Sequence, residues 1–164
     1  MSLKRRKQKS SLNLNREKVM ITSIFSVIVK KKSIEDLIKK GGHSHFNPHI
    51  VGLLQQEEIH KAEVKKIALF RFSKEIVSQQ AILEMHLAGY RPATAYEVLC
   101  LNVKKMGTIS IMALGTIKVF CGRKYVLSVL AEGGFSCVNL VEDYDEYHGR
   151  DCCWRSHHFA AVRR

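Results

Sequence analysis

The sequence predicts an α+β fold in which helices come first, a small antiparallel sheet follows, and a long loop precedes the last strand. Two observations lead to this prediction. Segments with helix-capping residues and glycine stop signals fill much of residues 33–107, and four short β-like runs separated by turns fill the rest. Helices followed by strands are typical of the α+β class. The 164 residues suit one domain, which we place at 19–164, after a basic arm at 1–18.

The first predicted element is a buried strand at residues 19–29, VMITSIFSVIV, because β-branched residues dominate it. This run is too short to span a bilayer, and the lysines that follow it leave no signal-peptide cleavage site. A helix comes next. Ser33 can cap this helix, Glu35 suits its first turn, and Gly41 stops it.

Two helices and one strand are predicted in the middle of the chain. Asn47 as cap and Pro48 at the first helical position start one helix. The run VKKIALFRF at residues 64–72 has the composition of a strand. The helix that follows this strand is capped by Ser73 and ended by Gly89.

The last helix begins at a capping box, in which the Thr94 hydroxyl and the Glu97 carboxylate satisfy each other's backbone donors, and it ends at Gly107. Four β-like runs remain: TISIMALGTIKVF, KYVLSVLA, FSCVNLVED and FAAVRR. CGR and EGG separate the first three runs and have the composition of tight turns. We expect the strand at 19–29 to pair beside the final strand, which would bring both ends of the domain together.

Much of the net charge of +12 lies in the first 18 residues. Such an arm could contact nucleic acid or an acidic surface, or it could be only a solubilising tail, and both alternatives stay open. Because no aromatic stacking platform or helix-turn-helix pattern accompanies the arm, we expect any nucleic-acid binding to be weak, non-specific and salt-sensitive. The contacts would come from Lys4, Arg5, Arg6, Lys7 and Lys9.

The five cysteines are odd in number and follow no disulfide-framework spacing. We therefore expect a reducing compartment and a cytoplasmic location. Cys100, Cys121 and Cys137 lie in apolar runs, where a free cysteine behaves as a small hydrophobic residue. No apolar run is long enough for a transmembrane helix.

Two histidine-rich stretches are candidates for metal binding, but neither has the spacing of a closed zinc site. We therefore expect no metal and no cofactor. The second stretch could also contain a catalytic thiol–histidine pair, but nothing in the sequence orients a base toward a nucleophile, so we expect no enzymatic activity. The residues concerned are His43, His45, His49 and His60 in the first group, and His148, Cys152, Cys153, His157 and His158 in the second.

The connection before the last strand, EDYDEYHGRDCCWRSHHF, is almost free of aliphatic residues. Tyr, Trp and Arg dominate binding hot spots, and Tyr with Ser, Gly and Asp is typical of paratopes. The composition therefore predicts a loop that binds a protein or another macromolecule, and the alternative is a polar loop with some residues packed inward. The candidate contacts are Tyr144, Asp145, Tyr147, His148, Arg150, Asp151, Cys152, Trp154, Arg155, Ser156 and His157.

The stretch GYRPATAYEVLCL and the terminal FAAVRR resemble two motifs of the C-type-lectin-like fold. Proteins of its branch shared with formylglycine-generating enzymes start a helix with Gly-aromatic-Arg-Leu-Pro-Thr-x-x-Glu and close on Gly-Phe-Arg-x-Val-Arg. Here Pro92-Ala93 replaces Leu-Pro, the Gly-Phe-Arg triplet is missing, and the cysteine pair of the enzymes has no counterpart that we can place. The matching residues, roughly in the second half of the chain, are Gly89, Tyr90, Arg91, Thr94, Glu97, Phe159, Val162 and Arg163.

The order RPAT..E, ALG, YV..L, Trp and F.AVR also resembles small bacterial proteins of unknown function. The loop is similar to that of variable proteins of diversity-generating retroelements, which often use a C-type-lectin-like scaffold. Reverse transcription that randomises adenines rewrites their C-terminal segment. Between residues 143 and 158, every residue except Glu146 and Trp154 can arise from an AAY codon in this way. The resemblance implies a non-enzymatic ligand-binding module with a hypervariable loop.

Overall fold

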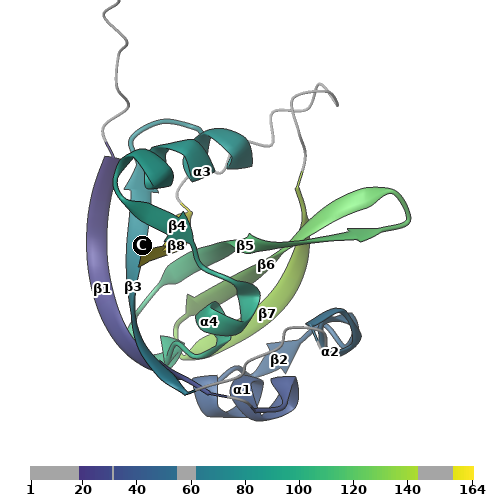
Figure 1. The fold of residues 1–164 in the computed structure, drawn as a ribbon. Helices are drawn as coiled ribbons and strands as arrows, with labels where there is room; N and C mark the ends of the chain where they lie inside the picture. The colour runs from purple at the N-terminus through teal and green to yellow at the C-terminus, as the bar shows by residue number, and fades with distance from the viewer. Residues whose placement is uncertain (1–18, 31, 55–61, 144–156) are drawn as a thin grey trace, which may run out of the picture.

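The structure is a computed structural model that describes residues 19–30, 32–54, 62–143 and 157–164 (Figure 1). These residues form a mixed α+β fold, which confirms the predicted class. In chain order the elements are β1 (Val19–Val29), α1 (Ile34–Gly41), β2 (His45–Phe46), α2 (His49–Leu54), β3 (Glu63–Phe72), α3 (Ser78–Leu87), β4 (Tyr90–Pro92), α4 (Ala95–Leu99), the 3-10 helix η1 (Val103–Lys105), β5 (Ile109–Phe120), β6 (Arg123–Glu132), β7 (Phe135–Glu142) and β8 (His158–Arg163).

The strands form one eight-stranded sheet in the order β1-β3-β8-β5-β6-β7-β2, and β4 pairs with β8 outside this path. The predicted all-antiparallel sheet is wrong, because β5 pairs with β8 and β2 pairs with β7 in parallel. The predicted separation of helices from strands is also wrong, because β1 and β3 belong to the same sheet as the C-terminal strands (Figure 1).

The predicted pairing of β1 with β8 is wrong because β3 lies between these two strands. The reason lies in the sequence of β3. Four consecutive residues, Ile67 to Phe70, are at most 1% exposed, so this strand is covered on both of its faces. A strand that is apolar on both faces belongs in the middle of a sheet, whereas β1 alternates and can occupy the edge.

The two faces of the sheet carry separate hydrophobic cores. The first face is covered by α1, α2 and α4, and the second face is covered by α3. The final strand contributes to both cores: Ala160 and Val162 point to the first face, and Phe159 and Ala161 point to the second. β8 is therefore a central element that fixes the position of the connection before it.

Local signals predict some helix ends correctly and miss others. The predicted end of the last helix at Gly107 is wrong, because α4 ends at Leu99 and only the 3-10 helix η1 follows it. The Ser33 hydroxyl accepts a hydrogen bond from the Asp36 amide at 3.1 Å, as a cap of α1 should. The left-handed residue after this helix is Gly42, with φ of 80°, and not Gly41. The predicted cap at Ser73 is wrong, because α3 starts only at Ser78. Ser73 and Lys74 form a bend, and Ile76, which is 3% exposed, packs in the second core before the helix begins.

Both predicted tight turns are confirmed. Cys121 and Gly122 have φ of 50° and 74°, and Gly133 and Gly134 have φ of 55° and 85°. Two successive positive φ values are the signature of the type I′ turn, which suits the twist of a β-hairpin. The expectation that Cys121 behaves as a small hydrophobic residue is wrong, since its place in the turn leaves the thiol exposed.

Candidate functional site

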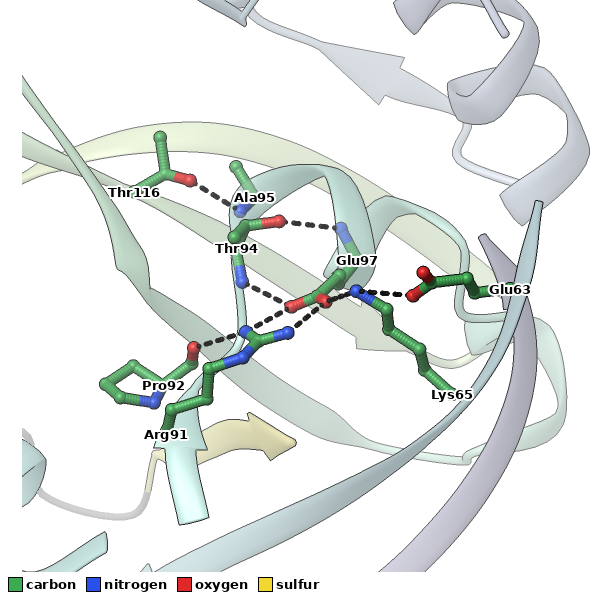
Figure 2. Close-up of polar contacts among 8 residues, drawn as sticks. All are labelled: Glu63, Lys65, Arg91, Pro92, Thr94, Ala95, Glu97 and Thr116. Carbon is green, nitrogen blue, oxygen red and sulfur yellow. Dashed lines mark hydrogen bonds and ion pairs between the residues drawn. The ribbon is translucent and has the colours of Figure 1, made fainter. Parts of the chain in front are cut away.

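A buried carboxylate organises the start of α4 (Figure 2). Thr94 and Glu97 form the predicted capping box, with each side chain bonded to the other's backbone amide. The Arg91 guanidinium donates to the two carboxylate oxygens of Glu97 at 2.9 and 2.6 Å, and the Lys65 ammonium donates at 2.9 Å. These contacts join β3, β4 and α4.

The charge state of Glu97 follows from these donors. Burial alone would raise the pKa of this carboxyl group, but hydrogen bonds from Arg91, Lys65 and the Thr94 amide outweigh it and lower the pKa overall. The residue is only 2% exposed. A carboxylate that is ionised, enclosed and surrounded by donors holds structure together and is not placed to exchange protons with a substrate.

A close backbone approach ties the same region to β5 and β8. The amide of Gly115 donates to Ala93 O at 2.9 Å, and the amide of Ala93 donates to Ala160 O at 2.8 Å. A Cβ atom at Gly115 would lie 2.5 Å from Ala93 O, so only glycine fits there. Next to it, the Thr116 hydroxyl accepts from the Ala95 amide at 3.0 Å (Figure 2).

Three of the sequence motifs therefore meet at one place in the fold. RPAT..E supplies Arg91, Thr94 and Glu97, ALG supplies Gly115, and F.AVR supplies the strand to which Ala93 bonds. The motif residues are used to build the framework. We call this group of contacts the framework node.

The two ends of the segment 144–156 are held by side chains from distant elements. The Ser78 hydroxyl at the start of α3 donates to Oδ1 of Asp143, and the Asp143 amide donates to Lys124 O at 2.8 Å. At the other end, Nδ1 of His157 shares a hydrogen bond with the Ser110 hydroxyl at 2.7 Å. Burial lowers the pKa of His157, which favours the neutral imidazole.

Among the predicted ligand contacts, the structure describes only His157, which is half-buried and bonded to Ser110. The other predicted ligand contacts, from Tyr144 to Ser156, lie outside the described residues, and so do Lys4, Arg5, Arg6, Lys7 and Lys9 of the basic arm. All of these remain predictions from the sequence.

The three histidines of the HSHFNPH stretch have separate environments. Nδ1 of His43 shares a hydrogen bond of 2.8 Å with the Ser136 hydroxyl, and burial lowers the pKa of His43 to about 4. The His45 ring lies 5.0 Å from the ring of Phe135, and the His49 amide donates to Oδ1 of Asn47. In residues 19–30, 32–54, 62–143 and 157–164, no group of three or more metal-ligating side chains is present.

One cleft was not predicted from the sequence. It has a volume of about 510 Å³ and lies between the start of α2 and the outer ends of β5, β6 and β7. Its lining is mostly apolar, and Phe120 in it is 57% exposed. Phe120, an aromatic residue next to a predicted tight turn, is a sequence signal for an exposed apolar surface. The approach of α2, which completes the cleft, has no such signal in the sequence. The lining residues are Asn47, Pro48, His49, Gly52, Phe120, Tyr125 and Leu140.

In the described parts of the chain, no helix has the length and apolar character needed to cross a membrane. Comparison with protein-family models, with curated proteins and with solved structures finds no match to this chain. The functional argument therefore depends on the residues and on their geometry.

Proposed function

We propose that this chain is a non-enzymatic ligand-binding module that presents residues 144–156 to a protein or another macromolecule. The observation that carries the proposal is the anchoring of both ends of this segment. Asp143 is held by Ser78 of α3, and His157 is held by Ser110 of β5. Fixed ends let the composition of a connecting segment change while the scaffold beneath it stays the same.

The separation of framework from segment supports the same function. The motif residues are engaged in the framework node, through contacts within residues 65–116 and with β8. The segment itself contains the Tyr, Trp and Arg side chains that supply contact area and directed hydrogen bonds in binding surfaces. In this proposal His157 positions the end of the segment, and residues within 144–156 contact the ligand.

We propose more specifically that the module belongs to the C-type-lectin-like proteins and that its loop is diversified by a retroelement. Its support is the Gly89–Glu97 motif at the start of α4 and the long connection that leads into the central strand β8. One feature departs from the resemblance: β3 lies between β1 and β8, where paired terminal strands are expected.

The experiment is to sequence the DNA around the gene. The proposal predicts a reverse-transcriptase gene and a near-copy of the segment encoding residues 125–164, with differences almost only at adenines in the copy. Absence of any such copy from the genome would contradict diversification.

The alternative function, nucleic-acid binding through the basic arm, would then be the better account. It predicts binding that weakens steeply with salt and is lost when residues 1–18 are removed. Affinity that is independent of salt would exclude this alternative.

A further inference from the structure

The outer edge of β1 is an open strand edge. β1 pairs with β3 on one side, and in the described part of the chain no strand pairs with its other side (Figure 1). Its eleven residues, VMITSIFSVIV, contain no charged residue and no proline. Natural proteins usually protect such edges with lysine, proline, a bulge or a covering element, because unpaired backbone groups there recruit other strands.

The first half of β1 has one of these protections and the second half does not. The register with β3 shifts between Ile21 and Ser23, and the Thr22 hydroxyl in this bulge donates to Leu69 O at 3.2 Å. A bulge twists the edge and disfavours further pairing. From Ser23 to Val29 the pairing with β3 is regular, so residues 23–29 form the unprotected part of the edge.

The second face of this part of β1 carries two exposed aliphatic side chains. Ile24 is 57% exposed and Ile28 is 61% exposed. Val64 of β3 lies opposite Ile28 in the register and is 73% exposed. Between Ile24 and Ile28 on this face lies Ser26, with the exposed Lys66 opposite it. Ile24 and Ile28 are therefore exposed aliphatic residues beside the open edge, and a strand paired there would partly bury them.

We propose that residues 23–29 pair antiparallel with the same residues of a second copy of this chain, about a two-fold axis at Ser26. This register places Ile24 of each copy opposite Ile28 of the other and keeps these side chains on one face of the joined sheet. Side chains opposite each other in an antiparallel pair lie on the same face, so the alternation of β1 matches itself. A two-fold pairing closes the interface.

The distribution of charge favours a second copy as the partner. An uncharged edge gains nothing from a partner strand that carries acidic or basic residues opposite it, and β1 supplies an uncharged partner of suitable length. In the proposed register Lys30 of one copy lies opposite Thr22 of the other. The two Lys30 residues are then about 27 Å apart, at about 3.4 Å per residue, which exceeds a Debye length of about 8 Å.

The first test is the molar mass of the full chain by size-exclusion chromatography with light scattering. At about 100 µM, a Kd of about 1 µM would leave most chains paired, so the expected mass is twice the 18.7 kDa of the chain. Ile24→Lys should raise the Kd of the dimer about 10-fold, measured over a dilution series, because it replaces the two Ile24–Ile28 cross-strand pairs, each of which contributes about 0.2–1 kcal/mol. The matched control is Val119→Lys, at a similarly exposed aliphatic residue of β5, which should leave the mass unchanged.

The second test is disulfide cross-linking in a background in which Cys121, Cys152 and Cys153 are replaced by serine. Residues that face each other across the two-fold axis have Cα atoms about 4.5–5.5 Å apart, within the range of a disulfide. Ser26→Cys should therefore form a covalent dimer on mild oxidation, and Ser23→Cys, about 20 Å from its own copy in this register, should not. A monomer at about 100 µM, a Kd that Ile24→Lys leaves unchanged, or equal cross-linking of the two cysteine variants would overturn the proposal.

Discussion

Arg91 and Glu97 form a bidentate ion pair in which the guanidinium nitrogens lie 2.9 and 2.6 Å from the two carboxylate oxygens. The Glu97 side chain is 3% exposed, whereas that of Arg91 is 35% exposed. The pair connects β4, which is hydrogen-bonded to β8, with the first turn of α4. The ion pair therefore stabilises the junction of β4 and α4, next to which the last strand, β8, is paired.

Glu97→Gln should destabilise the fold by about 3 kcal/mol, the low end for breaking a buried ion pair, because Arg91 remains partly solvated. The free energy of unfolding from urea titration measures this loss. Glu132→Gln is the control, since Glu132 is exposed and its replacement should change the free energy by less than about 0.5 kcal/mol. Equal losses for the two variants would show that the framework node contributes no stability.

Gly115→Ala should destabilise the fold by about 1–3 kcal/mol, because the new methyl group meets Ala93 O and forces the backbone apart. Gly52→Ala is the matched control. A Cβ atom at Gly52, within α2, meets no atom within 4 Å, and the change should stabilise the helix by about 0.5–1 kcal/mol. Thermal unfolding of both variants should give Tm shifts of opposite sign, and a Gly115→Ala variant as stable as the wild type would contradict the observed close approach.

The free energy of unfolding should decrease as the pH is lowered from about 6.5 to about 4, and the size of this decrease should depend on His43. Burial lowers the pKa of His43 to about 4, from the value of about 6.5 that histidine has in water. In this window the unfolded chain binds a proton that the folded chain does not, so acid favours unfolding, by at most about 3 kcal/mol. In His43→Asn, in which the amide can replace the contact to Ser136, the slope in this window should be smaller.

An NMR titration of the His43 ring checks the same point directly. A midpoint near 4 agrees with a buried neutral imidazole. A midpoint near 6.5 would show that the ring is solvated and would remove this residue from the acid sensitivity of the fold.

Ser78 and Asp143 should show energetic coupling. Each of Ser78→Ala and Asp143→Ala removes one partner of a hydrogen bond to a charged group, so a double-mutant cycle should give a coupling of about 1–2 kcal/mol. Urea unfolding of the wild type, both single variants and the double variant supplies the cycle. Strictly additive losses would mean that this contact does not hold the start of the segment 144–156.

The sequence predicted the features that depend on neighbouring residues. The strand at 19–29, the cap at Ser33, the capping box of Thr94 with Glu97, and the hairpin turns are all set within a few residues of one another. The strand order was not predictable in the same way. The apolar run from Ile67 to Phe70 marks β3 as an interior strand, but which strands flank it depends on pairings between residues far apart in the sequence, such as that of Ile67 with Val162.

The candidate site was likewise predictable only where it depends on local sequence. Composition identified the segment before the last strand, but its anchors, Ser78 and Ser110, lie 65 and 47 residues away from their partners in the sequence. Neither serine belongs to a motif, so no local pattern distinguishes it. Conversely, the motifs that support the family resemblance proved to be parts of the framework node.

The stability of a chain with a rewritten segment tests the central claim most directly. Every position of 144–156 except Glu146 and Trp154 would be replaced by another residue reachable from an AAY codon, and unfolding would be followed in urea. The account predicts a cooperative transition with a free energy within about 1 kcal/mol of the wild type, because surface substitutions on a fixed scaffold cost little. A loss above about 3 kcal/mol, typical of core disruption, would place the segment in the core and contradict its role as a replaceable binding surface.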